Sequence, residues 1–311
     1  MNLLRAPSEL QPRGKVVSLA IGMFDGVHLG HQQVIRQAVS DASQQEGVSI
    51  VVTFDRHPNT VVAPDRVPPL IYSVNQRLRA IEHLGVDAVL MLHFDETLSR
   101  KTGEEFIHEL VDGFGKLYSV CVGSTFHFGR ARSGNVALLH SLGKELHFTV
   151  HGLSAVSLDD ERVSSTRIRE AIRAGNLDLA GQMLGREYSL AGPVTKGDGI
   201  GRKMGVPTAN IDVTGLVVPP TGVYAVHCSI DGKSQQRGVV NIGIRPTLQN
   251  HSPALRVEAH LLDFDGDLYG KELELSFVQK LREEQKFPSL DALQKAIRAD
   301  IGKAVELFQR E

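Results

Sequence analysis

The sequence predicts an α/β protein of two domains, a doubly wound parallel sheet followed by a small antiparallel β-barrel with a C-terminal helix. The chain has 311 residues, more than the roughly 100–200 of an average domain. Short apolar runs alternate with helical patterns over residues 16–184, an order typical of a parallel sheet covered by helices. From Glu187 onward, closely spaced strands separated by Gly, Pro and Asp-Gly turns favour a barrel. We therefore expect domains at residues 1–185 and 186–311.

The elements of the first domain follow from periodicity. Residues 49–54 are a β-branched run that needs both faces covered, which indicates a buried strand. Residues 32–44 place four apolar side chains on one side of a helix. The other expected strands are 16–22, 87–94, 117–123 and 146–153, and the other expected helices are 76–84, 104–111, 166–174 and 177–184, the last capped by Asn176.

Turn signals organise the second domain. Asp231-Gly232 separates two alternating runs and predicts a hairpin. We expect a second hairpin at Asp265-Gly266. A final helix begins after Ser289 and carries an apolar stripe that we expect to pack on the barrel, formed by Leu290, Leu293, Ile297, Ile301, Val305 and Phe308.

Charge and cysteine content exclude several classes of protein. Lys and Arg number 34 and Asp and Glu 36, a net charge of -2, which argues against nucleic-acid or membrane-surface binding. Two distant cysteines exclude a disulfide scaffold and fit a reducing compartment. The first 15 residues have no apolar core, so we expect no signal peptide, and no apolar stretch reaches ~20 residues. We expect a cytoplasmic protein, and small anionic ligands and a weak homo-oligomer are left open.

A first candidate site lies in the turn of residues 22–31, between the first strand and the first helix. Ligands of doubly wound sheets bind at the carboxyl ends of strands, and a helix N-terminus suits phosphate. His28 and His31 are three residues apart, so both can donate hydrogen bonds to a phosphate chain. A metal site would need a third ligand at a recognisable spacing. A dinucleotide fingerprint would need a different glycine spacing.

A second candidate site lies in residues 192–210, which contain five glycines. Successive glycine N–H groups can surround a phosphate chain, and Lys196, Arg202 and Lys203 add positive charge. The Walker pattern is absent, so this segment is not a P-loop. On composition alone, a flexible Gly-rich turn is the competing interpretation.

Motifs of both segments resemble one known family. The quoted segments are G-x-F-D-G-V-H-x-G-H at 22–31, Thr53-Phe54-x-x-His57-Pro58, Gly123-x-x-Phe126-x-Phe128-Gly129, Ser164-Ser165-Thr166-x-Ile168-Arg169, Leu184-Gly-Arg-x-Tyr188, Pro207-Thr208-Ala209-Asn210, Gly222-Val-Tyr224, Asn241-Ile-Gly-x-Arg-Pro-Thr247, Val257-Glu-Ala-His-Leu-Leu-Asp-Phe264 and LREEQKF at 281–287. In this order they resemble the bacterial bifunctional riboflavin kinase/FMN adenylyltransferases (FAD synthetases).

For the first domain the resemblance implies a Rossmann-like nucleotidylyltransferase. A phosphate oxygen of FMN would attack the α-phosphorus of ATP, giving FAD and pyrophosphate, with His28 and His31 as catalytic residues. Phe126 and Phe128 would contact the flavin. Without the family, Ser164-Ser165-Thr166 would be only a helix cap. The implied nucleotide- and phosphate-binding residues are Gly22, Phe24, Asp25, Gly26, His57, Ser164, Ser165, Thr166 and Arg169.

For the second domain the resemblance implies a riboflavin kinase barrel that uses ATP as co-substrate and Mg²⁺. Glu258 would be the general base for the riboflavin 5′-hydroxyl, although by itself it could be a solvent-facing strand residue. Thr208 and Asn210 offer hard oxygen ligands to Mg²⁺. No tightly bound prosthetic group is expected. The implied phosphate-binding residues are Gly197, Gly199, Gly201 and Lys203, and the flavin-binding residues are Arg282 and Phe287.

The chain departs from the family's pattern at Met23, where Asn is usual, and at Thr125, where Asp or Asn is usual. Its second element reads Thr-Phe-Asp-Arg-His-Pro at 53–58. Two alternatives therefore stay open at this stage. One is a monofunctional riboflavin kinase with a weakened, regulatory adenylyltransferase domain. The other is a non-catalytic flavin- or nucleotide-binding regulator.

Overall fold

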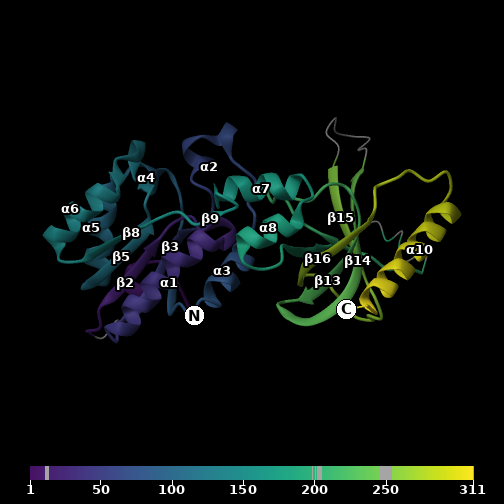
Figure 1. Cartoon of the computed structure of the whole chain (residues 1–311), viewed down its shortest axis with the longest axis horizontal. Helices are drawn as coiled ribbons and strands as arrows, with labels where there is room; N and C mark the ends of the chain where they lie inside the picture. Colours follow the sequence, from purple (N-terminus) through teal and green to yellow (C-terminus); the bar gives the residue numbers. More distant parts are fainter. Residues whose placement is uncertain (11–13, 198, 200, 202–204, 246–253, 311) are drawn as a thin grey trace. The chain divides into compact units, whose positions relative to one another are not determined.

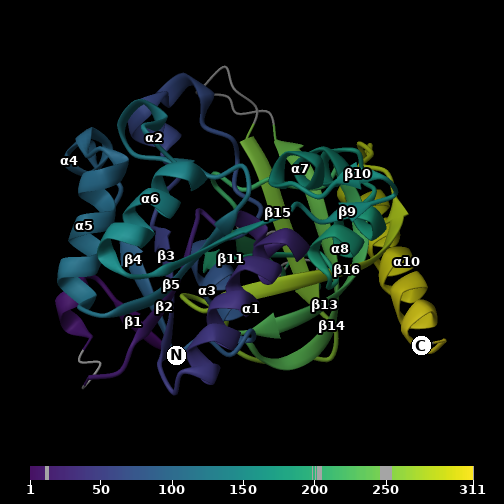
Figure 2. The same cartoon turned by 60° about the vertical axis from the view of Figure 1, so that its left-hand side comes forward.

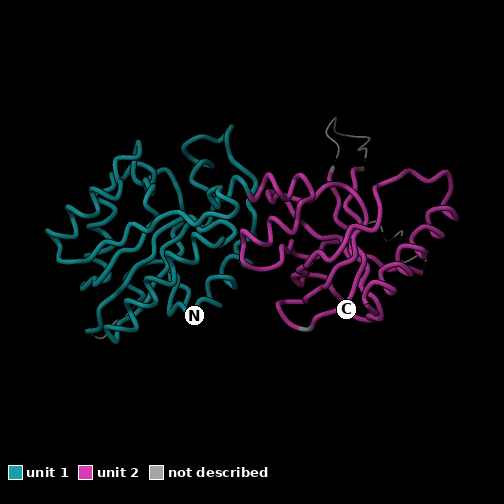
Figure 3. Tube along the Cα trace, viewed as in Figure 1, with its two compact units in different colours: residues 1–167 teal, residues 168–311 magenta. Residues whose placement is uncertain are grey.

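The structure, a computed structural model, describes residues 1–10, 14–197, 199, 201, 205–245 and 254–310. The chain forms two compact units, Met1–Arg167 and Ile168–Glu311 (Figure 3). The first contains a six-stranded parallel sheet with helices, and the second contains a closed six-stranded antiparallel barrel (Figure 1). Both predicted architectures are confirmed.

The parallel sheet of the first unit has the order β1-β4-β3-β2-β5-β8. The chain passes from β2 through β3 to β4 on one side, and β5 and β8 then add on the other side of β2. The switch point therefore lies between β2 and β5. Sequence analysis missed β1, whose three residues are too few for a periodic signal. The strands are β1 (Asn2–Leu4), β2 (Val17–Ile21), β3 (Val48–Phe54), β4 (Ala88–Leu92), β5 (Leu117–Gly123) and β8 (Thr149–Leu153).

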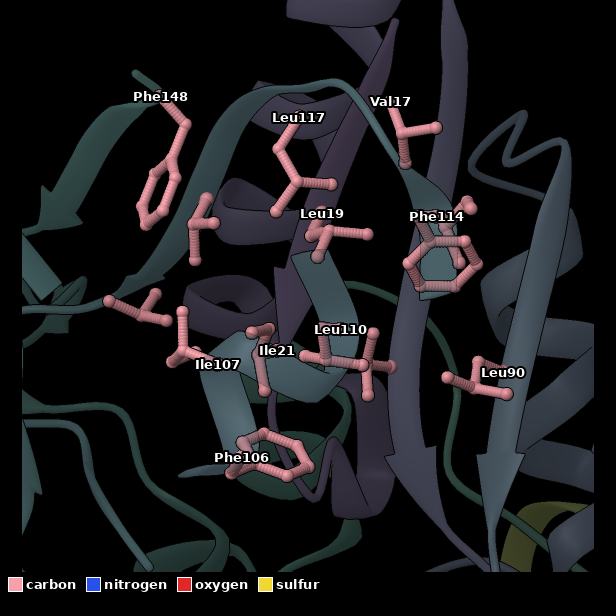
Figure 4. Close-up of a cluster of buried hydrophobic side chains, with 14 of the residues drawn as sticks. Val17, Leu19, Ile21, Leu90, Phe106, Ile107, Leu110, Phe114, Leu117 and Phe148 are labelled. Atoms are coloured by element: carbon pink, nitrogen blue, oxygen red, sulfur yellow. The ribbon is translucent and has the colours of Figure 1, made fainter. Parts of the chain in front are cut away.

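Helices cover both faces of this sheet. On one face α1 (Leu29–Gln44) and α3 (Val74–Glu82) pack on the sheet through residues such as Ile35 and Ile81. On the other face α5 (Gly103–Phe114) and α6 (Val136–Leu146) bury a cluster that includes Phe106 and Leu110 of α5 with Leu19 of β2 (Figure 4). The inner strands β2, β3, β4 and β5 are buried on both faces, which explains their continuous apolar runs.

The strand expected over 146–153 begins only at Thr149. Leu146 instead ends α6, a helix that sequence analysis missed, and His147 closes it in the left-handed conformation (φ 62). Asn176 caps α8 as predicted, because its side chain accepts from the Leu179 N–H. The other elements are α2 (Asn59–Val62), α4 (Glu96–Arg100), α7 (Ser165–Arg173), α8 (Leu177–Leu184), and the short strands β6 (His127–Phe128), β7 (Gly134–Asn135), β9 (Ser157–Leu158) and β10 (Glu161–Arg162).

The barrel of the second unit closes in the order β11-β12-β15-β14-β13-β16. The Asp231-Gly232 hairpin is confirmed: both residues have positive φ (50 and 70), and the turn joins paired strands. The hairpin expected at Asp265-Gly266 is wrong. The strand before it pairs with β12 and β14 and the strand after it with β11 and β13, so this turn crosses between strands that are not neighbours. The strands are β11 (Ser189–Thr195), β12 (Ala209–Ile211), β13 (Gly222–Ile230), β14 (Lys233–Arg245), β15 (Ala254–Leu261) and β16 (Glu272–Arg282).

The last helix, α10 (Leu290–Phe308), lies along the outside of the barrel (Figures 1 and 2) and is capped by Ser289, as expected. Two members of its predicted stripe, Leu290 and Val305, are 67% and 38% exposed. The side facing the barrel runs through Ala304 and Phe308, which turns Val305 to the flank. Among the helices of the described residues, none has the length and apolarity needed to span a membrane.

Candidate functional site

A first cavity of about 370 Å³ opens at the switch point of the parallel sheet. Its wall comes from residues that follow three strands: 22–24 after β2, 123–126 at the end of β5, and 153–156 at the end of β8. The carboxyl ends of parallel strands share one edge, so segments far apart in sequence meet here. The cavity therefore occupies the place where the sequence predicts ligand binding.

The turn that follows β2 has a strained backbone. Phe24 and the β-branched Val27 both adopt positive φ (51 and 42), conformations that cost of order 1–3 kcal/mol each. The buried Asp25 carboxylate holds the turn by accepting from the N–H groups of Ile71 (2.9 and 3.1 Å) and Tyr72 (3.3 Å). Asp25 lies outside the cavity wall, and these hydrogen bonds fix the turn.

The two histidines of this turn line the cavity side by side. His28 caps α1, and its Nδ1 accepts from the His31 N–H at 3.3 Å. The rings are stacked with centroids 3.5 Å apart. Because Nδ1 accepts, the neutral His28 ring carries its proton on Nε2. Within the part of the chain that the structure describes, no group of three or more His, Cys, Asp or Glu residues is placed to hold a metal ion.

The start of α7 forms another part of the wall. Ser164 Oγ accepts from the Arg167 N–H (3.2 Å), the capping role that sequence alone suggested. Ser165 Oγ donates to the Asp25 carbonyl (3.1 Å), which joins this helix start to the strained turn. Both serines line the cavity. Thr166 is exposed outside the wall, and Arg169 is buried one turn further along.

Three other predicted residues lie outside the wall. A Cβ on Gly26 would come within 3.0 Å of Ile71, so Gly26 serves the close packing of the turn. His57 Nδ1 accepts from the Asn59 N–H in the loop after β3. Phe128 stacks on Phe126 with centroids 5.1 Å apart, and only Phe126 lines the cavity.

Two arginines that sequence analysis missed support this site. Arg77, 1% exposed, donates to the carbonyls of Met23 (2.9 Å) and Phe54, which ties together the carboxyl ends of β2 and β3. Burial lowers the pKa of Arg77. Arg162 lines the cavity and donates to Thr125 Oγ1 (2.9 Å). Thr125 thus keeps a side-chain acceptor at this position. No periodic pattern marks either arginine.

A second cavity, of about 380 Å³, lies on the outer side of the barrel. Along β15, Val257 and Ala259 are each 1% exposed and fill the barrel, whereas the alternate residues line the cavity. Glu258 pairs in register with Asn210 of β12 and with Asn241 of β14. Three adjacent strands thus place a carboxyl and two amide side chains at one level of the wall.

Close backbone packing shapes the part of this wall formed by Thr208 and Asn210. A Cβ on Gly197 would fall 2.1 Å from Asn210 Nδ2, and one on Gly201 would fall 3.0 Å from Thr208 Oγ1. Only glycine permits this approach. Gly199 and Gly201 also line the cavity. Lys203 lies outside the described residues.

The flavin-binding residues predicted for the barrel also reach this cavity. Arg282 forms an ion pair with Asp300 of α10, with Nε 3.0 Å from both carboxylate oxygens and Nη2 2.9 Å from one. The Arg282 guanidinium lies 5.4 Å from the centre of the Phe287 ring. Sequence analysis missed Asp300, which lies on the buried face of α10 with Ala304 and Phe308.

Two further residues of β15 were missed. Arg256 Nη1 lies 3.4 Å from Glu258 Oε1, and His260 Nδ1 donates to the Pro207 carbonyl (2.8 Å). Both line the cavity with Glu258. The period of two along a strand could have placed them on this face from the sequence.

Comparisons with known proteins also divide the chain into an N-terminal and a C-terminal part. A family model described as FAD synthetase matches residues 10–167, and one described as riboflavin kinase matches residues 184–308. The bifunctional riboflavin kinase/FMN adenylyltransferase of Pseudomonas fluorescens is 42% identical over 98% of this chain and 97% of that protein. The protein of the same name from Escherichia coli K12 is 36% identical over 99% and 96%.

A solved structure shares the fold. A crystal structure described as a macrolide-efflux protein from Streptococcus pneumoniae superposes with a TM-score of 0.78 at 27% identity, covering 96% of this chain and 97% of that one. Matches to both family models and to full-length relatives show that this chain belongs to the bifunctional riboflavin kinase/FMN adenylyltransferase family.

Proposed function

We propose that the chain phosphorylates riboflavin to FMN at the barrel cavity and adenylylates FMN to FAD at the switch-point cavity, with ATP as co-substrate of both reactions. The observation that carries the proposal is that each cavity gathers, from distant segments, the groups its reaction needs. One has Glu258 beside Asn210 and near Thr208, and the other has the stacked His28 and His31 beside a helix start.

In the kinase reaction, Glu258 takes the proton of the riboflavin 5′-hydroxyl as that oxygen attacks the γ-phosphorus and ADP leaves. Thr208 and Asn210 would hold Mg²⁺, which when bound neutralises phosphate charge. The glycine backbone packed against both side chains supports this fit, because it keeps them in the wall of the barrel cavity. Arg282 and Phe287 hold the flavin ring. The phosphate-binding residues proposed here are Gly197, Gly199, Gly201 and Lys203.

In the adenylyltransferase reaction, a phosphate oxygen of FMN attacks the α-phosphorus of ATP and pyrophosphate leaves. His28 offers its Nε2–H to the oxygens on which charge develops, and the ring of His31, stacked against it, shares this task. Ser164 and Ser165 add hydroxyls, and the α7 N-terminus adds N–H groups. Phe126 contacts the flavin. Asp25 and Arg77 act indirectly, by holding the turn in place.

We also propose that the two activities divide near Gly185, with the adenylyltransferase in residues 1–185 and the kinase in 186–311. The αL Gly185 (φ 69) ends α8, and the barrel begins four residues later. The cytoplasm is the proposed location, because both reactions need ATP.

One assay tests the proposal. The full chain is incubated with Mg-ATP and either riboflavin or FMN, and riboflavin, FMN and FAD are separated by chromatography. The expected products are FMN and FAD from riboflavin, and FAD from FMN. FMN without FAD would identify a monofunctional kinase. That alternative is not favoured, because both family models match and both histidines line a cavity. Complete inertness would point to a non-catalytic regulator.

A further inference from the structure

His260 makes a long-range contact with the segment that carries Thr208. The His260 ring lies on the Glu258 side of β15 and lines the barrel cavity. Its Nδ1 lies 2.8 Å from the carbonyl oxygen of Pro207, 53 positions away in the chain. Because a carbonyl can only accept, His260 Nδ1 carries the proton of this hydrogen bond.

The hydrogen bond between His260 and Pro207 lies next to the end of the backbone pairing between β12 and β15. β12 pairs with β15 at Ala209↔Ala259 and Asn210↔Glu258. Before Ala209 the chain leaves the ladder, and Pro207 has no N–H with which to continue it. The His260 ring supplies the next link between the two strands.

We infer that His260 is a positioning residue of the kinase site, which holds the Pro207 carbonyl and thereby fixes Thr208 for the metal–phosphate group. The inference rests on the proposed function, since it assumes that Thr208 and Asn210 serve Mg-ATP. The peptide unit between Pro207 and Thr208 is planar. A hydrogen bond to its oxygen therefore fixes the orientation of this plane and the position of the Thr208 Cα. Asn210, at the other end of this segment, is already held by the ladder.

Three substitutions at this position separate positioning from bulk stability. His260→Asn keeps an amide N–H near the place of Nδ1. His260→Gln carries its amide one bond further, near the place of Nε2, and His260→Leu has no donor. His227→Leu is the matched control, because this other barrel histidine packs on Phe308 (ring centroids 5.2 Å apart).

The measurement is FMN formation by the full chain as a function of free Mg²⁺ and of ATP, at saturating riboflavin. FAD formation from FMN by the same samples reports on the integrity of the first unit. We expect His260→Leu and His260→Gln to raise the half-saturating Mg²⁺ and the KM for ATP roughly three- to tenfold, the value of one hydrogen bond. His260→Asn should stay near the wild type, and the KM for riboflavin should not change.

Equal behaviour of the Asn, Gln and Leu variants would overturn the inference, as would unchanged Mg²⁺ and ATP dependence in His260→Leu. If His260→Leu does not fold, the comparison of Asn with Gln still decides. An equal rise in the half-saturating Mg²⁺ and the KM for ATP in His227→Leu would show that the effect is not specific to His260, which also contradicts the inference. Absence of FMN with the wild type refutes the proposed function itself, so the two failures are distinguishable.

Discussion

Removing Asp300 should destabilise the barrel unit and loosen the part of its cavity wall formed by Arg282. Asp300 is 3% exposed, and Asp300→Ala would leave the Arg282 guanidinium without its carboxylate in a mostly buried place. Breaking a buried pair costs about 3–5 kcal/mol. Because the Arg282 side chain is 19% exposed, its hydration offsets part of this cost. We therefore expect the free energy of unfolding to fall by about 3 kcal/mol.

For a unit of about 140 residues, this loss corresponds to a fall in Tm of roughly 10 °C. Calorimetric unfolding of the full chain measures it, and riboflavin titration at low temperature measures binding. The double variant Asp300→Leu with Arg282→Met removes both charges, so we expect it to recover most of the stability but to bind riboflavin weakly. A loss below about 1 kcal/mol in Asp300→Ala, or a double variant as unstable as the single one, would refute this reasoning.

Three further outcomes are expected. Glu258→Gln should lower the kinase kcat by about 10²–10⁴-fold while FAD formation from FMN continues, and kinase turnover near the wild-type rate would contradict the general-base role. His28→Ala combined with His31→Ala should abolish FAD formation and leave FMN formation intact; chromatography of the products checks this, and surviving FAD synthesis would exclude the pair. Burial, and then Glu283, raises the pKa of Tyr224 to about 12, so the folded state holds this proton more tightly. The free energy of unfolding should therefore be insensitive to this group below about pH 10 and fall as the pH rises toward about 12. Denaturant titrations should show a smaller fall in the free energy of unfolding over this pH range in Tyr224→Phe. Identical pH profiles of the variant and the wild type would contradict this role of Tyr224.

Local sequence signals predicted the elements well where they were long and self-contained. β5 and α8 have the expected bounds, and Asn176 and Ser289 cap helices through contacts three residues away. The Asp231-Gly232 hairpin was predictable because its two positive-φ residues determine the pairing of adjacent strands. The turn at Asp265-Gly266 carries the same local signal, yet barrel closure gives its flanking strands other partners.

In the candidate sites, too, local sequence signals predicted some features and distant contacts determined others. Motifs identified His28, Ser164, Thr208 and Glu258, because each motif is a short segment of fixed spacing, and the structure places all four at cavity walls. The roles of these residues in the reactions stay predictions.

The sequence by itself thus determined most of the longer elements, the change from α/β to β-barrel, and the motif segments. Only the tertiary structure decided how side chains within the motifs are used. Asp25 lies outside the cavity wall and accepts from the Ile71 N–H, and Phe128 packs on Phe126. His260 reaches Pro207 across 53 positions. Such contacts depend on where distant segments meet, and periodicity reports only which face of its own element a residue occupies.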